Sequence, residues 1–362
     1  MCGLCSAAIG HWAKPARPAE RQRATIRPIM GAMRLLACPD KFRGTLTATE
    51  ACRAIEAAAI AAGWTAMVQP MADGGEGTLD AFGGPNRTTT VTGPLGAPVS
   101  ARWRLRADHA VVEMAEASGL VLAGGAEGNN PMEATTAGTG ELISAAAEAG
   151  ARHIVVGLGG SATTDGGLGA LKAMAPLPRF RGIDLEVACD VTTLFADAAS
   201  VFGPQKGASA AQISLLTRRL DRLAEVYHRE HGVAVGAFLR SGAAGGLGGG
   251  LAAAGASLRD GFELIAEEVD LYGQIEEVDL VVTGEGALDH TSFEGKVVGG
   301  VLKLAEAAGV AVVAVVGCAA STPEGDWPIE VIDLSEIYGT DRAVSEAAAC
   351  VTEALSDWLS RR

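Results

Sequence analysis

The chain has 362 residues, enough for about two domains of ordinary size, and its formal charge is −14 at pH 7. Hydrophobic residues at 48% and charged residues at 20% are typical of a globular protein and exclude a disordered one. An acidic chain without a basic stripe is a poor candidate for binding nucleic acid or an anionic membrane, and no segment has the long, glycine-poor apolar run of a membrane span. We therefore expect neither partner.

Residues 1–32 differ from the rest of the chain. They hold five basic residues and one acidic residue, and their apolar stretch is broken by Gly10 and His11, which does not fit a signal peptide. We expect a disordered or mis-started leader, with Met30 or Met33 as the true start.

The seven cysteines are scattered along the chain, and their odd number favours reduced thiols in a cytoplasmic protein. Cys2 and Cys5 have the spacing of a redox or zinc half-site, but no second pair accompanies them.

A β-α-β unit opens the regular part of the chain. Residues 34–38 form a short apolar run suited to a buried strand. Thr47 and Glu50 have the spacing of a capping box, which predicts a helix that ends at Gly63, and residues 65–69 read as the next strand. This order predicts a parallel sheet.

The middle of the chain has a different pattern of predicted strands and helices. We expect strands over residues 88–91, 99–105, 110–114, 153–156 and 185–188. We expect helices from about Thr139 to Gly150, over 209–229, and over the small-residue stretch 241–256, which should pack closely against a neighbour.

Alternating strands and helices return toward the C-terminus. Strands are predicted over 279–283, 310–316 and 329–332, with helices over 293–308 and from about Asp341. The fold class is therefore α/β in two domains: a doubly wound, Rossmann-like domain from residues 33–69 and 290–362, interrupted by a mixed α/β domain over 70–289. The site should lie where they meet, beyond the carboxyl ends of strands.

Three of the apolar strands end in an acidic residue, namely Asp40, Asp190 and Glu285. Carboxylates at strand ends beside glycine loops suit a Mg²⁺ ion held near phosphates. Singly, each could merely cap the following helix, but their recurrence favours a site.

Three glycine-rich segments also contain acidic residues; they span residues 71–77, 159–167 and 283–289. Glycine allows backbone N–H groups to converge on an anion, while adjacent carboxylates hold a metal or a hydroxyl. The acidic and hydroxyl residues in these segments are Asp73, Glu76, Ser161, Asp165, Glu285 and Asp289.

Residues 157–162 (GLGGSA) also fit a dinucleotide-binding pattern, with Asp184 at about the right distance. Against it, residues 165–167 prolong the loop where that pattern needs a helix. The sequence around Gly295-Lys296 does not match the phosphate-loop motif of P-loop enzymes. His290 stands where that motif has its first glycine, and Val297 stands where it has a serine or threonine.

Basic residues are few near these segments. Lys41 and Arg43 follow the first strand, and Lys206 and Lys296 each adjoin a glycine. Arginine can clamp a carboxylate through two hydrogen bonds and lysine can offset phosphate charge, although each could instead be a solvated surface charge.

Seven motifs together resemble the type I glycerate kinase family over about residues 34–320. They are CPDKFRGT (38–45), PMADGGEGT (70–78), VEMAEASGL (112–120), GLGGSATTDGG (157–167), ACD (188–190), FGPQKGA (202–208) and TGEG (283–286). The resemblance implies ATP- and Mg²⁺-dependent phosphorylation of D-glycerate by two α/β domains, the first discontinuous. The sequence departs from the family pattern at five positions: Lys41, Arg43, Thr164, Ala287 and His290.

The resemblance and the residue chemistry together suggest roles for these side chains. Arg43, helped by Lys41, would anchor the substrate carboxylate, and Asp190 would accept the hydroxyl proton. The remaining expected substrate-binding residues are Asp40, Asp73, Glu76, Ser161 and Asp165. The expected cofactor-binding residues are Gly159, Gly160, Ser161, Lys206, Glu285 and Lys296, and the expected metal ligands are Asp190, Glu285 and Asp289.

The expected partners are ATP, Mg²⁺ and the small molecule D-glycerate, with a homo-oligomer left open. Two other functions remain as alternatives: a sensor that binds nucleotide or sugar acid without turnover, and a nicotinamide-dependent hydroxy-acid oxidoreductase.

Overall fold

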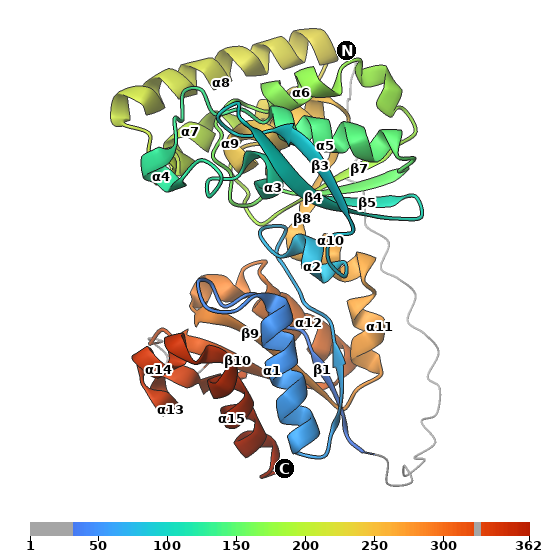
Figure 1. The fold of residues 1–362 in the computed structure, drawn as a ribbon, viewed down its shortest axis with the longest axis vertical. Coiled ribbons are helices and arrows are strands. Elements are labelled where there is room, and N and C mark those ends of the chain that lie inside the picture. The colour runs from blue at the N-terminus through green and yellow to red at the C-terminus, as the bar shows by residue number, and fades with distance from the viewer. Residues whose placement is uncertain (1–31, 322–326) are drawn as a thin grey trace, which may run out of the picture. The chain divides into compact units, whose positions relative to one another are not determined.

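The computed structural model describes residues 32–321 and 327–362 (Figure 1). The expected leader, apart from Ala32, lies outside the described residues, as do Cys2 and Cys5. None of the helices in the described ranges is both long and apolar enough to cross a membrane.

The first sheet has five strands, all parallel, in the order β11-β10-β9-β1-β2. Its strands are β1 (Arg34–Ala37), β2 (Thr65–Val68), β9 (Leu280–Leu288), β10 (Ala311–Ala319) and β11 (Glu330–Asp333). Segments from the first and last parts of the described chain therefore build one sheet, and the blue and red parts of the ribbon lie together in Figure 1. This confirms the expected Rossmann-like fold class.

Helices cover both faces of this sheet because neighbouring residues of a strand point to opposite sides. Leu35 packs with Ile55 of α1 (Ala48–Ala61) and Leu355 of α15 (Ala347–Leu359). Leu36 packs on the other face with Val301 of α12 (Val297–Ala308) and Phe262. The same face carries α10 (Gly261–Glu268) and α11 (Leu271–Glu276), while α13 (Leu334–Tyr338) and α14 (Thr340–Ser345) precede α15.

The second sheet has six strands in the order β3-β4-β5-β6-β7-β8. Its strands are β3 (Arg87–Thr92), β4 (Pro98–Arg106), β5 (His109–Glu113), β6 (His153–Gly157), β7 (Asp184–Cys189) and β8 (Ser257–Asp260). The first three pair antiparallel, and β5 to β8 pair parallel, so the sheet is mixed as expected. Strand β8 has no counterpart among the strands expected from the sequence.

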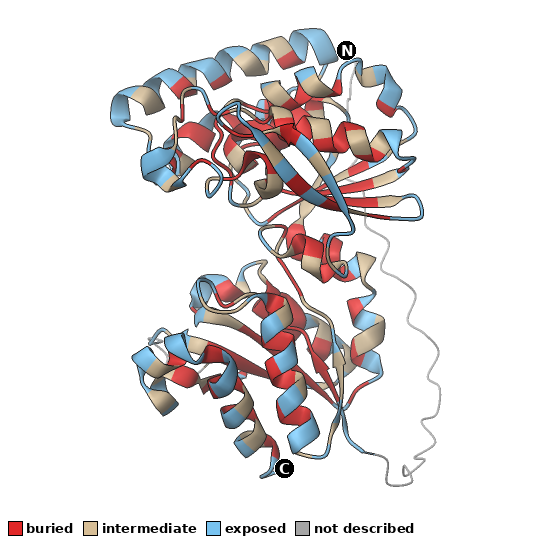
Figure 2. Cartoon of the chain, viewed as in Figure 1, coloured by how far each residue is buried: buried red, intermediate tan, exposed pale blue. Residues whose placement is uncertain are grey.

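The longer helices of this part of the chain are α5 (Ala137–Glu148), α6 (Leu168–Met174), α8 (Ala210–His231) and α9 (Ala243–Ala253). Short helices connect them: α2 (Thr78–Ala81), α3 (Ala115–Ser118), α4 (Gly125–Gly128) and α7 (Ala198–Phe202). Figure 2 shows the buried residues concentrated along both sheets and the inner faces of the helices.

Several expected element boundaries are confirmed and others are corrected. The Thr47–Glu50 capping box forms as expected, with the Glu50 N–H donating to Thr47 Oγ1 at 3.1 Å. The small-residue helix α9 does pack closely, but it is non-helical at Ala244–Gly246, where a Cβ on Gly245 would lie 1.9 Å from the Thr163 carbonyl oxygen. Helix α12 begins at Val297 instead of residue 293 because Gly295 has a φ of +82°.

Strand β9 is longer than the sequence indicated. It extends to Leu288, with Glu285 opposite Val316 and Ala287 opposite Cys318, so most of the expected loop over 283–289 is strand. Membership of the five-stranded sheet also places residues 280–288 with the chain ends, whereas the predicted domain boundary lies at 289/290. The division into domains stays a prediction.

The start of helix α10 touches the loop that carries Asp73. A Cβ on Gly261 would lie 1.8 Å from the Asp73 carbonyl oxygen, so the two backbones are in direct contact. On α10, Phe262 packs in the core beneath the five-stranded sheet, while Leu264 packs with Val155 and Ala188 of the six-stranded sheet. One helix therefore holds the Asp73 loop against both sheets.

Gly261→Ala should therefore lower the free energy of unfolding by about 1–3 kcal/mol, because the added methyl group has no space. Gly236→Ala is a matched control, since nothing lies within 4 Å of the place where its Cβ would stand; its effect should stay within about 0.5 kcal/mol. Urea denaturation of the two variants measures the difference. Equal stabilities would show that the contact at Gly261 can relax freely.

Candidate active site

Four carboxyl groups gather where strands of the two sheets end. Asp40 follows β1, Glu285 lies in the neighbouring strand β9, Asp190 follows β7, and Asp73 lies in the loop after β2. Asp73 raises the pKa of each of the other three carboxyl groups, so each of them lies within electrostatic reach of Asp73, and the four residues are here called the acid cluster.

Burial is the largest cause of the raised pKa values in the acid cluster. It raises the pKa of Asp40 to about 7, against the opposing effect of Lys41. The pKa values of Asp190 and Glu285 are also raised, first by loss of solvent around each carboxyl group. Within the described residues, Glu285 Oε1 is buried without a hydrogen-bond partner. The cluster thus contains a buried carboxylate oxygen that the described residues leave without a hydrogen bond.

Lys41 supplies positive charge inside the acid cluster. Its Nζ lies 3.5 Å from Asp40 Oδ1 and 4.0 Å from Asp73 Oδ1. Burial lowers the pKa of Lys41, but Asp40, Asp73 and Glu76 together raise it above the ordinary value. The side chain is therefore charged at neutral pH.

Lys296 is held by Thr291 and acts on the acid cluster through its charge. Its Nζ donates to Thr291 Oγ1 at 2.7 Å, and Thr291 Oγ1 donates to Asp289 Oδ1 at 2.6 Å. The Thr291 hydroxyl lowers the pKa of Asp289, which also accepts from the Thr291 N–H. Lys296 lowers the pKa values of Asp190 and Glu285, so its charge acts on the cluster.

The glycine loops lie in direct backbone contact. A Cβ on Gly159 would be 2.4 Å from Gly75 Cα, and one on Gly74 would be 2.6 Å from the Ala188 carbonyl oxygen. Gly74 also has a φ of +90°, which favours glycine. Close packing therefore accounts for these glycines.

Lys206 is inside the protein. It is 2% exposed, and its Nζ donates to Ser161 Oγ and to the Thr163 carbonyl oxygen, each at 2.7 Å. Burial lowers the pKa of Lys206 to about 7, against the opposing effect of Asp165. Lys206 and Ser161 thus hold the loop over residues 159–165, and their expected contacts with a cofactor stay a prediction.

Asp165 is engaged by backbone and hydroxyl groups at the starts of two helices. Its Oδ2 accepts from the Thr136 N–H, the Thr136 hydroxyl and the Gly169 N–H, while Oδ1 accepts from the Gly167 N–H, at 2.9–3.1 Å. These four bonds orient α5 and α6. Its expected substrate contact likewise stays a prediction.

A cavity of about 700 Å³ opens beside the acid cluster. Lys41 and Arg43 line it from the loop after β1, and Glu76, Arg102 and Gly160 line it from the part of the chain that carries the six-stranded sheet. Arg43 is exposed and makes no ion pair within the described ranges. Because Lys41 contacts both the cavity and the cluster, it connects them.

The comparisons with known proteins agree with this architecture. The family model described as the glycerate kinase family matches residues 35–176 and 175–360. The chain belongs to the glycerate kinase family. It is 38% identical to a glycerate kinase of Bacillus subtilis (strain 168) over 79% of this chain and 85% of the relative.

Two further similarities come from enteric bacteria. The chain is 39% identical to a glycerate 2-kinase of Escherichia coli (strain K12), over 76% of this chain and 82% of the relative. A crystal structure assigned to glycerate kinase 2 of Salmonella typhimurium LT2 superposes with a TM-score of 0.77 at 33% identity, covering 91% of this chain and 98% of that one.

The dinucleotide interpretation of residues 157–162 is wrong for this member of the glycerate kinase family. Helix α6 begins at Leu168, beyond the second glycine pair, so no helix opens within the pattern. Gly159 instead packs on Gly75.

Sequence reasoning missed Glu113. This carboxyl group is 7% exposed, and its Oε1 accepts from the N–H groups of Gly77 and Leu79 at 3.0 and 2.7 Å. Burial raises its pKa to about 7. The signal was present, because Glu113 is a fourth acidic residue at the end of an apolar strand.

An ion pair near Asp190 was also missed. Arg240 Nη2 lies 2.9 Å from Asp260 Oδ2, and Asp260 Oδ1 accepts from the Glu263 N–H at the start of α10. Arg240 has a φ of +72°, and no sequence pattern pointed to it.

The buried Lys206 predicts a pH dependence of stability. Between pH 7 and about 10 the unfolded chain holds a proton at this lysine that the folded chain lacks, so stability rises with pH. Relative to Lys206→Met, the wild type should gain up to about 1.4 kcal/mol per pH unit over this range. Urea denaturation at several pH values measures it, with Lys303→Met as the control for losing a surface lysine. Parallel curves for wild type and Lys206→Met would contradict the lowered pKa of the buried lysine.

Proposed function

We propose that this chain is a glycerate kinase that transfers the γ-phosphoryl group of ATP to a hydroxyl of D-glycerate with Mg²⁺ bound. The observation that carries the proposal is the acid cluster joined through Lys41 to a cavity that presents the free guanidinium of Arg43. Family membership supports the reaction class. Nothing in the comparisons supports the sensor or the nicotinamide oxidoreductase.

The acid cluster fits a magnesium ion. Mg²⁺ prefers oxygen ligands, and its usual protein ligands are one or two carboxylates together with substrate phosphates. Glu285 Oε1 is buried and unpaired within the described residues, and the Asp190 carboxyl group lies within electrostatic reach of Asp73. Asp190 and Glu285 would hold the ion, whereas Asp289 has one oxygen committed to Thr291. When bound, Mg²⁺ neutralises phosphate charge.

Arg43 and Lys41 would bind the glycerate carboxylate. The cavity also has acidic lining residues, among them Glu76, Asp80 and Glu116, which repel an anion. An anionic substrate therefore needs local positive charge, and an arginine fork matches a carboxylate through two hydrogen bonds. Lys41, held by Asp40 and Asp73, would place this carboxylate next to the acid cluster.

Asp190 would orient the reacting hydroxyl and accept its proton. It follows β7, and the raised pKa of its carboxyl group, caused first by loss of solvent, makes it a stronger base than an ordinary aspartate. Asp40 and Asp73 would hold Lys41 in place for this step.

The backbone of residues 159–161 and the ammonium of Lys296 would contact the ATP phosphates. Gly160 lines the cavity, and the charge of Lys296 acts on Asp190 and Glu285. The relative from Escherichia coli is named a glycerate 2-kinase, which favours the 2-hydroxyl as acceptor. We also expect the enzyme to work in the cytoplasm on this small molecule.

Release of ADP that requires both D-glycerate and Mg²⁺ tests the function, and NMR of the product distinguishes the 2- from the 3-phosphate. Asp190→Asn should lower kcat roughly 100-fold or more with little change in glycerate affinity. Asp197→Asn, on an exposed aspartate of the following 3₁₀ helix, is the matched control. Unchanged kcat in Asp190→Asn would remove this carboxylate from the chemistry, and ATP binding without ADP release would favour the sensor.

Arg43→Ala should lower kcat/KM for D-glycerate by roughly 30-fold to several-thousand-fold, because Arg43 would form a charge pair with the bound carboxylate, and losing such a pair once water is excluded costs about 2–5 kcal/mol. Arg53→Ala, on the exposed side of α1, should leave kcat/KM unchanged. Steady-state kinetics with varied glycerate provides the comparison. An Arg43→Ala enzyme within twofold of wild type would rule out the clamp.

A further inference from the structure

One carboxyl group in the cavity beside the acid cluster has no part in the proposed reaction. Glu113, the last residue of β5, is 7% exposed and lines this cavity together with Lys41 and Arg43. It forms no ion pair within the described residues, and the guanidinium of Arg102, which also lines the cavity, is paired with Glu116 instead. The carboxyl group of Glu113 is therefore available to a molecule that enters the cavity.

The two oxygens of Glu113 have different surroundings. Oε1 accepts from the N–H groups of Gly77 and Leu79, at 3.0 and 2.7 Å, and these two backbone donors hold the side chain in place. Oε2 makes no hydrogen bond within the described part of the chain, and it is not among the atoms there that are shielded from solvent. Because Glu113 lines the cavity, Oε2 is the oxygen that opens on it. The cavity thus contains a fixed hydrogen-bond acceptor.

This acceptor lies near the basic residues of the cavity. Glu76 directly precedes Gly77, whose N–H binds Glu113, and Glu76 also raises the pKa of Lys41. Lys41 is therefore within electrostatic reach of the segment that holds Glu113. Lys41 and Arg43 attract the carboxylate of a bound acid, whereas Glu113 repels it and can accept a hydrogen bond from a hydroxyl. These opposite charges orient a hydroxy acid, with its carboxylate toward the basic residues and a hydroxyl toward Glu113.

We propose that Oε2 of Glu113 accepts a hydrogen bond from the 3-hydroxyl of D-glycerate. The site then selects 2-hydroxy acids whose third carbon carries an uncharged hydrogen-bond donor. This inference rests on the proposed function, in which Arg43 holds the substrate carboxylate and Asp190 the reacting 2-hydroxyl. Glu113 moves no proton in the reaction; it binds and orients the substrate.

A third contact of this kind allows the site to distinguish the two mirror forms of glycerate. The second carbon carries a carboxylate, a hydroxyl, a hydroxymethyl group and a hydrogen atom. Arg43 and Asp190 contact only two of these groups, and two contacts leave the molecule free to turn about the line that joins them. The contact of the hydroxymethyl group with Glu113 fixes the third position, so that only one mirror form meets all three partners.

Two related acids separate hydrogen bonding from charge at this position. D-Lactate has a methyl group where D-glycerate has the hydroxymethyl group, so its binding excludes water from Oε2 and supplies no donor. A site that hydrogen-bonds a substrate hydroxyl discriminates against an analogue without it, because the polar group of the protein is then left unpaired. Tartronate has a second carboxylate at the same place, which meets Glu113 as a like charge.

Isothermal titration calorimetry of the full chain with the three acids tests the proposal, without added Mg²⁺ because tartronate chelates it. Burial raises the pKa of Glu113 to about 7, so at about pH 8 the group is mostly ionised. The wild type should bind D-glycerate roughly 10- to 100-fold more tightly than D-lactate, and tartronate more weakly than D-glycerate. Glu113→Gln keeps an oxygen for the two N–H groups but removes the charge, so tartronate should gain about tenfold or more relative to D-glycerate. Glu225→Gln, on an exposed part of α8, should keep the wild-type ratios.

Three results would overturn the proposal. They are wild-type binding of D-lactate as tight as that of D-glycerate, an equal change for all three acids in Glu113→Gln, as a purely structural role would produce, and a 3-phosphate product, because the 3-hydroxyl would then be the reacting group. Far-UV circular dichroism identifies a variant that fails to fold, and the wild-type comparison of D-glycerate with D-lactate then decides. Because the readout is binding, a lack of ADP release would count against the proposed phosphoryl transfer and leave this comparison intact.

Discussion

Repulsion among partly buried carboxyl groups is the constraint on which the candidate active site depends. Burial is the largest cause of the raised pKa values of Asp40, Asp190 and Glu285, and Asp73 raises each of them further. Lys41 lowers this cost by lying between Asp40 and Asp73, but it does not satisfy Glu285 Oε1. Buried charges without partners reduce stability, and such groups concentrate at functional sites. Cation binding would turn this unfavourable arrangement into a favourable one.

Contact between backbones fixes the distances within this site. Gly74, Gly159 and Gly261 each bring one segment so close to another that a side chain could not fit. The Asp73 loop is thereby packed against the ends of strands β6 and β7 and against the start of α10. Contacts of this kind leave little freedom for adjustment, because protein interiors are close-packed. The carboxyl groups therefore cannot move apart to relieve their repulsion.

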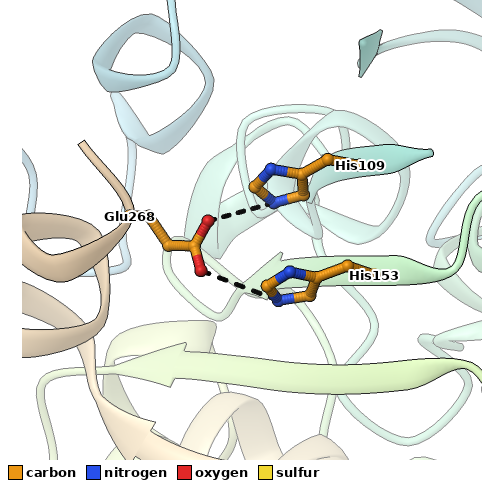
Figure 3. Close-up of side chains that lie close together, drawn as sticks. All are labelled: His109, His153 and Glu268. Atoms are coloured by element: carbon orange, nitrogen blue, oxygen red, sulfur yellow. Dashed lines mark ion pairs between the residues drawn. The ribbon is translucent and has the colours of Figure 1, made fainter. Parts of the chain in front are cut away.

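Helix α10 connects the two sheets. Its start touches the backbone of Asp73, and its last residue, Glu268, lies beside the stacked rings of His109 and His153 (Figure 3). Phe262 and Leu264, two residues apart on this helix, pack toward different sheets, so the orientation of the helix affects both.

The sequence by itself determined the fold class, most strand positions and the Thr47 capping box, because these follow from hydrophobic pattern and from local capping chemistry. It missed Glu113 although the same pattern marks it. Tertiary structure alone decided that Lys206 is buried against Ser161, that Asp165 caps helices, that Glu285 lies within a strand and that His109 and His153 stack. Those outcomes depend on which distant segments share a surface, and burial and pairing arise from that contact and not from local spacing.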